Sequence, residues 1–174
     1  MPKDKRRKKG GILLFTVENG ELVAHLQQRG RYDYNHGKPN TWPGICQVTA
    51  EGKRRPDENP LQAAVREAEE ELQTKLSPMV WYALLGGMDR LPIHKDKHIS
   101  IFGLLVPTEA MKTIRLERIT GGLVRVKEKD IDSLIPAIPM WRIEAHPHYY
   151  RDIVVLPETI LALRKGFARF KRLI

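Results

Sequence analysis

Three carboxylates stand close together near the middle of the sequence: Glu67, Glu70 and Glu71. If this segment is helical, with about 100° between successive residues, the three side chains share one arc of the helix surface. Like charges three and four residues apart repel each other, so the cluster is unfavourable unless cations offset it. Arg66, four residues before Glu70, can neutralise one acid. Oxygen ligands favour Mg²⁺ or Mn²⁺, and magnesium often completes its shell with substrate phosphates. The cluster therefore indicates a metal site for phosphate-ester chemistry.

A helix over residues 59–72 would position these acids. Asn59 can cap it, Pro60 suits the first helical position, and Gln62 can complete a capping box. Five apolar side chains share the adjoining arc and predict the face that packs on a core: Leu61, Ala64, Val65, Ala68 and Leu72. Glu71 lies nearest to this face, so we expect the acids at the margin of a buried surface.

The segments around this helix predict a β-sheet and further helices. Runs rich in β-branched and apolar residues predict six strands, at 12–17, 22–26, 45–49, 80–86, 99–106 and 123–126. An Asn-Gly pair at 19–20 predicts a hairpin between the first two strands. We expect four other segments: a polar loop at 29–41, a helical turn at 130–134, an irregular Pro-containing connector at 136–150 and a helix at 157–173. The last helix carries apolar side chains at helical spacing and should dock on the domain.

The composition is that of a globular protein. The chain has 174 residues, which favours one domain with an extension, and 41% of them are hydrophobic. No apolar run approaches the ~18 residues that a membrane span needs, and the N-terminus lacks the apolar stretch of a signal peptide. Cys46 stands alone, so no internal disulfide is inferred. We expect a cytoplasmic protein with no membrane partner.

The net charge of +9 is concentrated at the two ends of the chain. Residues 2–9 carry six cations and one acid, and residues 164–174 carry five cations and no acid, so residues 10–163 are left with −1. Residues 1–9 are interpreted as a basic, disordered tail. A weak contact with RNA through the basic ends is the one nucleic-acid interaction that this distribution supports.

The wider spacing of the acids resembles the Nudix box. That signature reads G-x5-E-x7-R-E-U-x-E-E-x-G-U, where U is a bulky apolar residue, and six of its seven strictly specified positions match: Gly52, Glu58, Arg66, Glu67, Glu70 and Glu71. Three positions depart from it. Gln73 replaces the closing glycine, whose left-handed turn would then have to be made differently, while Thr74 replaces an apolar residue and Ala68 is small.

The resemblance covers residues 10–135 and implies a Nudix-type α/β/α sandwich with a mixed β-sheet. Residues 136–174 would add the connector and the docking C-terminal helix. It also implies that Glu67, Glu70 and Glu71 bind the metal, Mg²⁺ or Mn²⁺. A backbone carbonyl beside Gly52, here that of Glu51, would complete the protein ligands.

The remaining box residues would support these ligands. Arg66 would hold the carboxylates, and Glu58 would brace the loop through an ion pair. Glu67 or Glu70 would act as the general base, with Glu117 as the alternative outside the box. Arg29, which follows the second strand, could contact phosphate.

The implied activity is hydrolysis of a diphosphate linkage in a nucleoside diphosphate-linked compound. A metal-oriented water would attack one phosphorus, and one product would be a monophosphate. The sequence names neither the organic group nor the phosphorus attacked, and it leaves the oligomeric state open, a homodimer included.

Two alternatives remain. An isopentenyl-diphosphate isomerase shares the fold and uses a cysteine upstream of the box, where Cys46 lies, but its cysteine is followed by a His-Pro pair that is missing here. A catalytically silent module that binds nucleotides or RNA is the second alternative. The complete set of box acids favours the hydrolase over both.

Overall fold

The computed structural model describes residues 8–34, 36–73, 91–116, 120–142 and 152–174. The strand expected at 80–86, as well as Thr74 and Glu117, lies outside the described residues.

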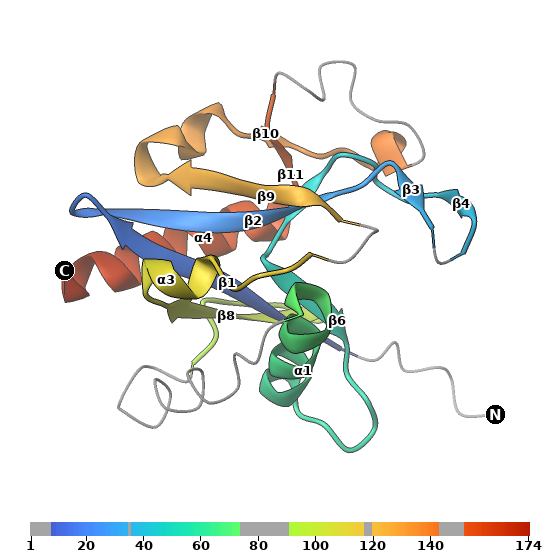
Figure 1. Cartoon of the computed structure of the whole chain (residues 1–174), viewed down its shortest axis with the longest axis horizontal. Coiled ribbons are helices and arrows are strands. Elements are labelled where there is room, and N and C mark those ends of the chain that lie inside the picture. The colour runs from blue at the N-terminus through green and yellow to red at the C-terminus, as the bar shows by residue number, and fades with distance from the viewer. Residues whose placement is uncertain (1–7, 35, 74–90, 117–119, 143–151) are drawn as a thin grey trace.

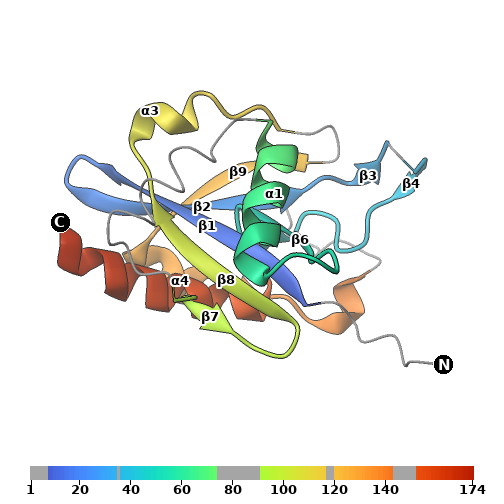
Figure 2. The same cartoon turned by 90° about the horizontal axis from the view of Figure 1, so that it is seen from below.

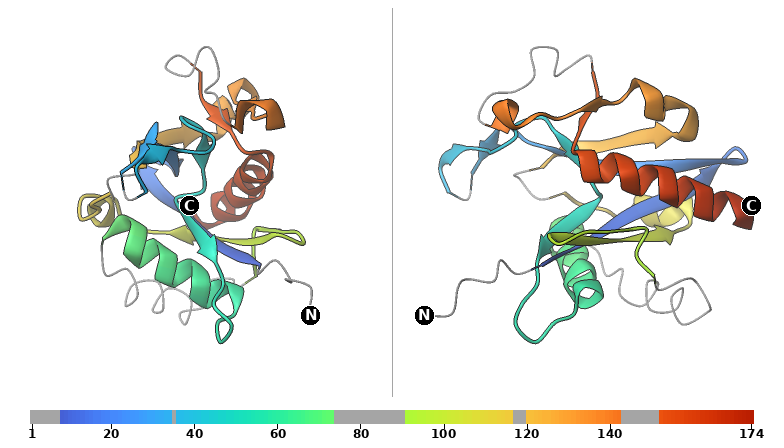
Figure 3. Two further views of the ribbon diagram at one scale, coloured as in Figure 1. Left: turned by 90° about the vertical axis from the view of Figure 1, so that its right-hand side faces the viewer. Right: turned by 180° about the vertical axis from the view of Figure 1, so that it is seen from behind.

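Strand β1 (Lys9–Glu18) runs through the centre of the fold and is buried on both faces. Ile12 and Leu14 pack under helix α1 (Pro60–Leu72), whereas Leu13 and Phe15 pack under helix α4 (Pro157–Phe170). Figure 3 shows the two helices on opposite faces of the sheet. Because successive side chains of a strand point to opposite faces, a strand covered on both sides needs the continuous apolar run seen here.

The sheet is mixed, as predicted. β1 pairs antiparallel with β2 (Glu21–Arg29) and parallel with β8 (Ile99–Leu105). The strand order is β10-β11-β5-β2-β1-β8-β7, with β6 also paired to β1 and β9 to β2. Figure 1 shows β9, β2, β1 and β8 crossing the middle of the molecule. The other strands are β5 (Cys46–Gln47), β6 (Ala50–Lys53), β7 (His94–Lys95), β9 (Thr120–Lys127), β10 (Ile135–Pro136) and β11 (Val154–Val155).

The short strand predicted at 45–49 is confirmed in part: β5 covers only Cys46–Gln47, because the chain changes partners after it. β5 pairs with β2, and β6 then pairs with β1. Thr49 lies between the two pairings, where its Oγ1 accepts from Leu14 N at 2.9 Å and donates to His25 O at 2.5 Å. The hydroxyl thus replaces the backbone hydrogen bonds that a continuous strand would have made.

Two segments expected to be irregular contain short strands. The polar loop at 29–41 holds the hairpin of β3 (Tyr32–Asp33) and β4 (Lys38–Pro39). The connector begins within β10 and includes the 3₁₀ helix η2 (Pro139–Arg142). β10 pairs parallel with β11, which pairs with β5 in turn, so this part of the chain extends the sheet.

Besides α1, α4 and η2, the remaining helices are short. In the described parts of the chain they are α3 (Thr108–Met111), the 3₁₀ helix η1 (Glu128–Ser133) at the predicted turn, and the 3₁₀ helix η3 (Lys171–Leu173). Phe167 and Phe170 of α4 contact Phe15, with ring centroids 5.3 and 5.0 Å apart. Among the described residues, no helix is both long enough and apolar enough to cross a membrane.

Candidate active site

Helix α1 presents the acids where the sequence predicted them. Asn59 and Gln62 form the capping box through reciprocal hydrogen bonds of 2.8 and 2.9 Å. Four of the five predicted core residues are buried, Leu61 is partly buried, and Ala63 joins them. The helix lies across β1, β6 and β8 (Figure 2), with its acidic edge at the margin of this contact.

Arg66 connects two of the acids to the loop before the helix. Its guanidinium makes a bidentate pair with Glu58, at 2.5 Å from Nε to Oε1 and 3.0 Å from Nη2 to Oε2. Nη1 donates to Glu67 at 2.8 Å and reaches Glu70 at 3.4 Å, and Nη2 donates to Lys53 O at 3.1 Å. One planar group therefore fixes three carboxylates relative to β6, which a lysine could not do.

Glu58 ties down the loop between β6 and α1. Besides its pair with Arg66, it accepts a hydrogen bond from Arg55 N at 2.9 Å. The hydrogen bond from Arg66, then that from the Arg55 backbone, lower the pKa of Glu58 to about 2. The carboxylate is therefore ionised throughout the neutral range, as a brace for a guanidinium requires.

Glu67 occupies the space in which Gly52 lacks a side chain. A Cβ at position 52 would lie 2.0 Å from Cδ of Glu67, so only glycine lets β6 approach this carboxylate so closely. Burial raises the pKa of Glu67, although its hydrogen bond to Arg66 acts in the opposite direction. A half-buried carboxylate of this kind is stabilised by any cation that binds beside it.

Glu71 is held from a different direction. Its Oε2 accepts a hydrogen bond from Nε2 of Gln27 on β2, at 3.1 Å. The three predicted ligands thus divide into two groups, since Glu67 and Glu70 turn toward Arg66 while Glu71 turns toward the sheet.

The helix ends with a left-handed residue despite the missing glycine. Gln73 caps α1 with φ 48° and ψ 38°, which is the conformation that the closing glycine of the box would adopt. The expectation that the helix with Gln73 at this position would end without the usual left-handed turn was therefore wrong. A residue with a Cβ adopts this conformation at a cost of roughly 1–2 kcal/mol, which the packed helix has to offset.

A divalent cation fits this edge of α1 by charge and by donor type. The carboxylates of Glu58, Glu67 and Glu70 pair with the guanidinium groups of Arg66 and, at 3.7 Å from Glu70, Arg55, and Glu71 lies on the same edge of the helix. Three negative and two positive groups leave one negative charge on this cluster, and Glu71 adds a further carboxylate to the set of hard oxygen donors. Within the described parts of the chain, no three acidic, histidine or cysteine side chains converge on one point. Cation binding by all three acids would thus require at least one of Glu67, Glu70 and Glu71 to turn from its present contact.

Comparison with known families decides the identity of this fold. The family described as NUDIX domain matches residues 5–149. The chain belongs to the Nudix family. This assignment confirms the predicted family, fold class and enzyme class, a Nudix-type hydrolase acting on phosphoanhydride bonds. A comparison with curated proteins gave no significant match.

Solved structures share the Nudix fold at low sequence identity. A mutT/nudix family protein from Listeria innocua has a TM-score of 0.57 and 21% identity, with 95% of this chain and 94% of that chain covered. An Ap4A hydrolase from C. elegans in a binary complex has a TM-score of 0.51 and 16% identity, covering 97% and 99% of the two chains. A MutT/nudix family protein from Enterococcus faecalis has a TM-score of 0.57 and 11% identity, covering 99% and 65%.

Cys46 lies on the wrong face for a role beside the Nudix box. Its side chain is buried in the core cluster under α4, together with Phe15 and Phe167, whereas the box acids lie on the α1 side. Burial raises the pKa of its thiol to about 12, so the reactive thiolate is scarcely populated at neutral pH. Both facts argue against the isomerase alternative.

Arg29 ends β2 near the acids. Nη1 donates to Oε1 of Gln47 at 3.4 Å, and Nε is buried without a hydrogen-bond partner among the described residues. Sequence reasoning singled out Arg29 but missed Gln27 and Gln47, which connect it to Glu71. The available signal was a buried glutamine in each of the two paired strands β2 and β5.

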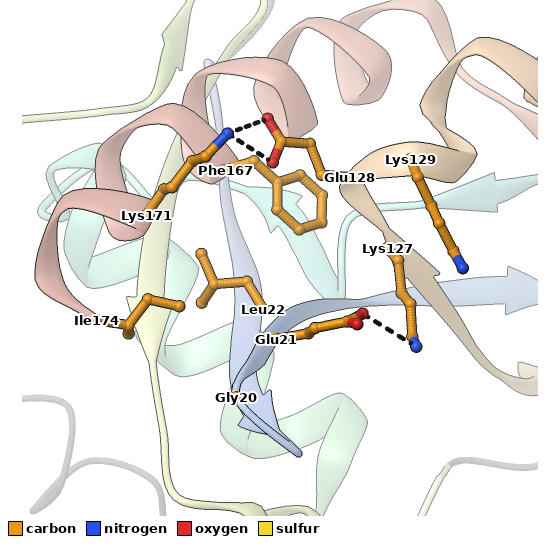
Figure 4. A pocket seen from close by; sticks show the side chains of 9 residues that line it. All are labelled: Gly20, Glu21, Leu22, Lys127, Glu128, Lys129, Phe167, Lys171 and Ile174. Carbon is orange, nitrogen blue, oxygen red and sulfur yellow. Dashed lines mark hydrogen bonds and ion pairs between the residues drawn. The ribbon is translucent and has the colours of Figure 1, made fainter.

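A cavity of about 340 Å³ lies at the opposite end of β2, beside the β1–β2 turn and the end of α4. Its floor includes Leu22 and Phe167, and ion pairs of Glu21 with Lys127 and of Glu128 with Lys171, both 3.1 Å, lie at its sides (Figure 4). These pairs already engage two of its lysines, and the cavity contains no predicted site residue.

Proposed function

We propose that this Nudix protein is a metal-dependent hydrolase that cleaves a diphosphate linkage in a nucleoside diphosphate-linked compound. The observation that supports it is the edge of α1, where Glu58, Glu67 and Glu70 pair with two guanidinium groups and Glu71 adds a fourth carboxylate at the margin of the sheet. Such a surface attracts a divalent cation, which in turn attracts a diphosphate. The Ap4A hydrolase from C. elegans, with the same fold, acts on a nucleotide-linked substrate, in agreement with this class.

The proposed roles follow from the contacts of each side chain. A divalent ion, Mg²⁺ or Mn²⁺, held by Glu67, Glu70 and Glu71, would supply the charge that activates water and neutralises the diphosphate. Arg66 orients Glu67 and Glu70 from one side, and Glu58 keeps Arg66 in place.

The reaction forms one P–O bond and breaks another. The oxygen of water attacks one phosphorus, Glu67 or Glu70 accepts the proton, and the bridging oxygen leaves with the remainder of the substrate. One product is a monophosphate.

Arg29 is the proposed contact for the substrate phosphate. Its buried Nε–H has no partner among the described residues, and a buried donor without an acceptor is costly. A phosphate oxygen would satisfy this donor and benefit from the charge of the guanidinium.

A hydrolysis screen with Mg²⁺ tests the proposal. The substrates should cover nucleoside triphosphates, nucleotide sugars, dinucleoside polyphosphates, coenzymes and capped RNA ends, with each product identified. We expect a monophosphate from at least one class and no turnover in excess EDTA. Binding without hydrolysis in every class would instead favour the silent nucleotide-binding module.

A further inference from the structure

A continuous chain of hydrogen bonds joins Arg29 to Glu71. Nη1 of Arg29 donates to Oε1 of Gln47 at 3.4 Å, Nε2 of Gln47 donates to Oε1 of Gln27 at 3.1 Å, and Nε2 of Gln27 donates to Oε2 of Glu71 at 3.1 Å. The register of β2 and β5 places Gln27 directly opposite Gln47, so the two amides are a cross-strand pair.

The chain has a fixed direction. Each amide turns its oxygen toward the guanidinium and its NH₂ toward the carboxylate. If the amide of Gln27 were reversed, its oxygen would face the carboxylate and its NH₂ would face that of Gln47. Both amides are only 5% exposed, so water cannot readily replace a lost partner. The cation of Arg29 at one end and the anion of Glu71 at the other select a single orientation.

We propose that Gln27 and Gln47 are positioning residues for Glu71, with Arg29 as the charged end of the chain. The inference rests on the proposed function of Glu71 as a metal ligand. Glu67 and Glu70 are oriented by a cation, Arg66, which competes with a metal ion for the same oxygens. Gln27 orients Glu71 through an uncharged donor, so this contact adds no positive charge that would repel the ion.

Two variants remove the chain without changing any charge. Gln27→Met and Gln47→Met keep the approximate side-chain volume and remove the amide. The matched control is Gln28→Met, because Gln28 is the neighbouring glutamine of β2 and its Nε2 donates to Gly44 O at 3.2 Å instead. Affinity for Mn²⁺ is measured by the electron paramagnetic resonance of the free ion, with no substrate present.

We expect Gln27→Met to weaken Mn²⁺ binding by about 10- to 100-fold, the usual cost of losing a group that orients a ligand. Gln47→Met should weaken it in the same direction but less, although this residue contacts no predicted ligand. The double variant should bind no worse than Gln27→Met, because Gln47 acts through Gln27. With substrate, the Mg²⁺ concentration for half-maximal rate should rise while kcat at saturating Mg²⁺ stays near that of the wild type. The control should match the wild type in every measurement.

Thermal unfolding of each variant shows whether its fold survives. If a variant does not fold, an NMR measurement on the wild-type chain still tests the inference. In an NMR titration with Mg²⁺, the side-chain amide signals of Gln27 and Gln47 should shift with one midpoint, and that of Gln28 should not. Suppose that the wild-type chain binds Mn²⁺ and hydrolyses its substrate. The inference, but not the proposed function, is then overturned if both folded variants bind Mn²⁺ as tightly as the wild type, or if the Gln47 signal does not shift. A wild-type chain that neither binds the ion nor turns over overturns the proposed function.

Discussion

Gly10 and Gly52 lie directly opposite each other where β1 pairs with β6, and α1 fills the space of both missing side chains. The atoms that fill it differ. A Cβ at Gly10 would lie 2.0 Å from the backbone oxygen of Pro60 and 2.8 Å from the backbone nitrogen of Ala64. For a Cβ at Gly52, the three nearest atoms all belong to the side chain of Glu67. One glycine therefore permits the helix to dock, and the other permits a carboxylate to lie beside the strand.

Substituting alanine at these two positions should separate stability from activity. Gly10→Ala pushes the helix backbone away from β1 and should destabilise the fold by about 1–3 kcal/mol or more. Gly52→Ala displaces only the side chain of Glu67, so the melting temperature should change little while kcat falls by about 100-fold, as for a misplaced catalytic group. Chemical denaturation and steady-state kinetics check both. Equal effects of the two substitutions on stability would contradict this division.

Glu71→Gln should abolish most of the metal-dependent activity. The substitution keeps the shape of the side chain but removes one of the negative charges that attract the cation, so kcat should fall by at least about 100-fold at fixed Mg²⁺. Glu109→Gln on α3, an exposed acid outside the box, serves as the control. Near-normal kcat in Glu71→Gln, or undiminished wild-type activity in excess EDTA, would show that the metal assignment is wrong.

His25 should make the stability of the fold depend on pH. It is buried against Thr16, whose Oγ1 lies 2.8 Å from Nε2, and burial lowers its pKa from 6.5 to about 4. The unfolded chain therefore binds more protons between these values, and stability is lost as the pH falls from 6.5 toward 4. The free energy of unfolding should fall by up to about 1.4 kcal/mol per pH unit in this window.

Denaturant titrations between pH 4 and 7 measure this slope. His25→Gln should reduce it, whereas His98→Gln, at an exposed position between β7 and β8, should leave it unchanged. A slope that persists in His25→Gln would assign the dependence to other groups.

Removing residues 1–7 should not affect hydrolysis of a small diphosphate. The truncation stops before Lys9, which begins β1, donates its N–H to His98 O at 2.8 Å and pairs with Glu51 at 3.4 Å. Four cations and one acid are lost, so any RNA binding should weaken and its salt dependence should decrease. Rates and RNA affinities across a salt series check both expectations. A large loss of kcat/KM for the small substrate would show that the tail reaches the site.

The C-terminal basic residues are the other candidate for an RNA contact, but the fold engages several of them. Arg164 pairs with Asp132 at 3.0 Å and Lys171 with Glu128 at 3.1 Å, while Arg169 donates to Leu91 O at 2.8 Å. An unchanged salt slope after truncation would direct attention to this face.

Local interactions explain what the sequence by itself determined. The start of α1, its capping box, its buried face and its acidic edge all depend on residues within four positions of one another, and helical periodicity makes such relationships readable. The strands β1 and β2 were predicted for a similar reason, because short β-rich runs on either side of an Asn-Gly turn are a local pattern. The spacing of the Nudix box residues along the sequence was also readable, and it identified the family.

Tertiary structure alone decided the contacts between distant segments. Gln27 meets Glu71 across 44 residues of sequence, Thr49 fills the break between β5 and β6, and Gly52 gives space to Glu67. Each depends on how β2, β5 and β6 are aligned beside α1, and strand register is set by the packing of the whole sheet rather than by neighbouring residues. The left-handed Gln73 has the same origin, because the packing of α1 offsets a backbone strain that local preference would avoid.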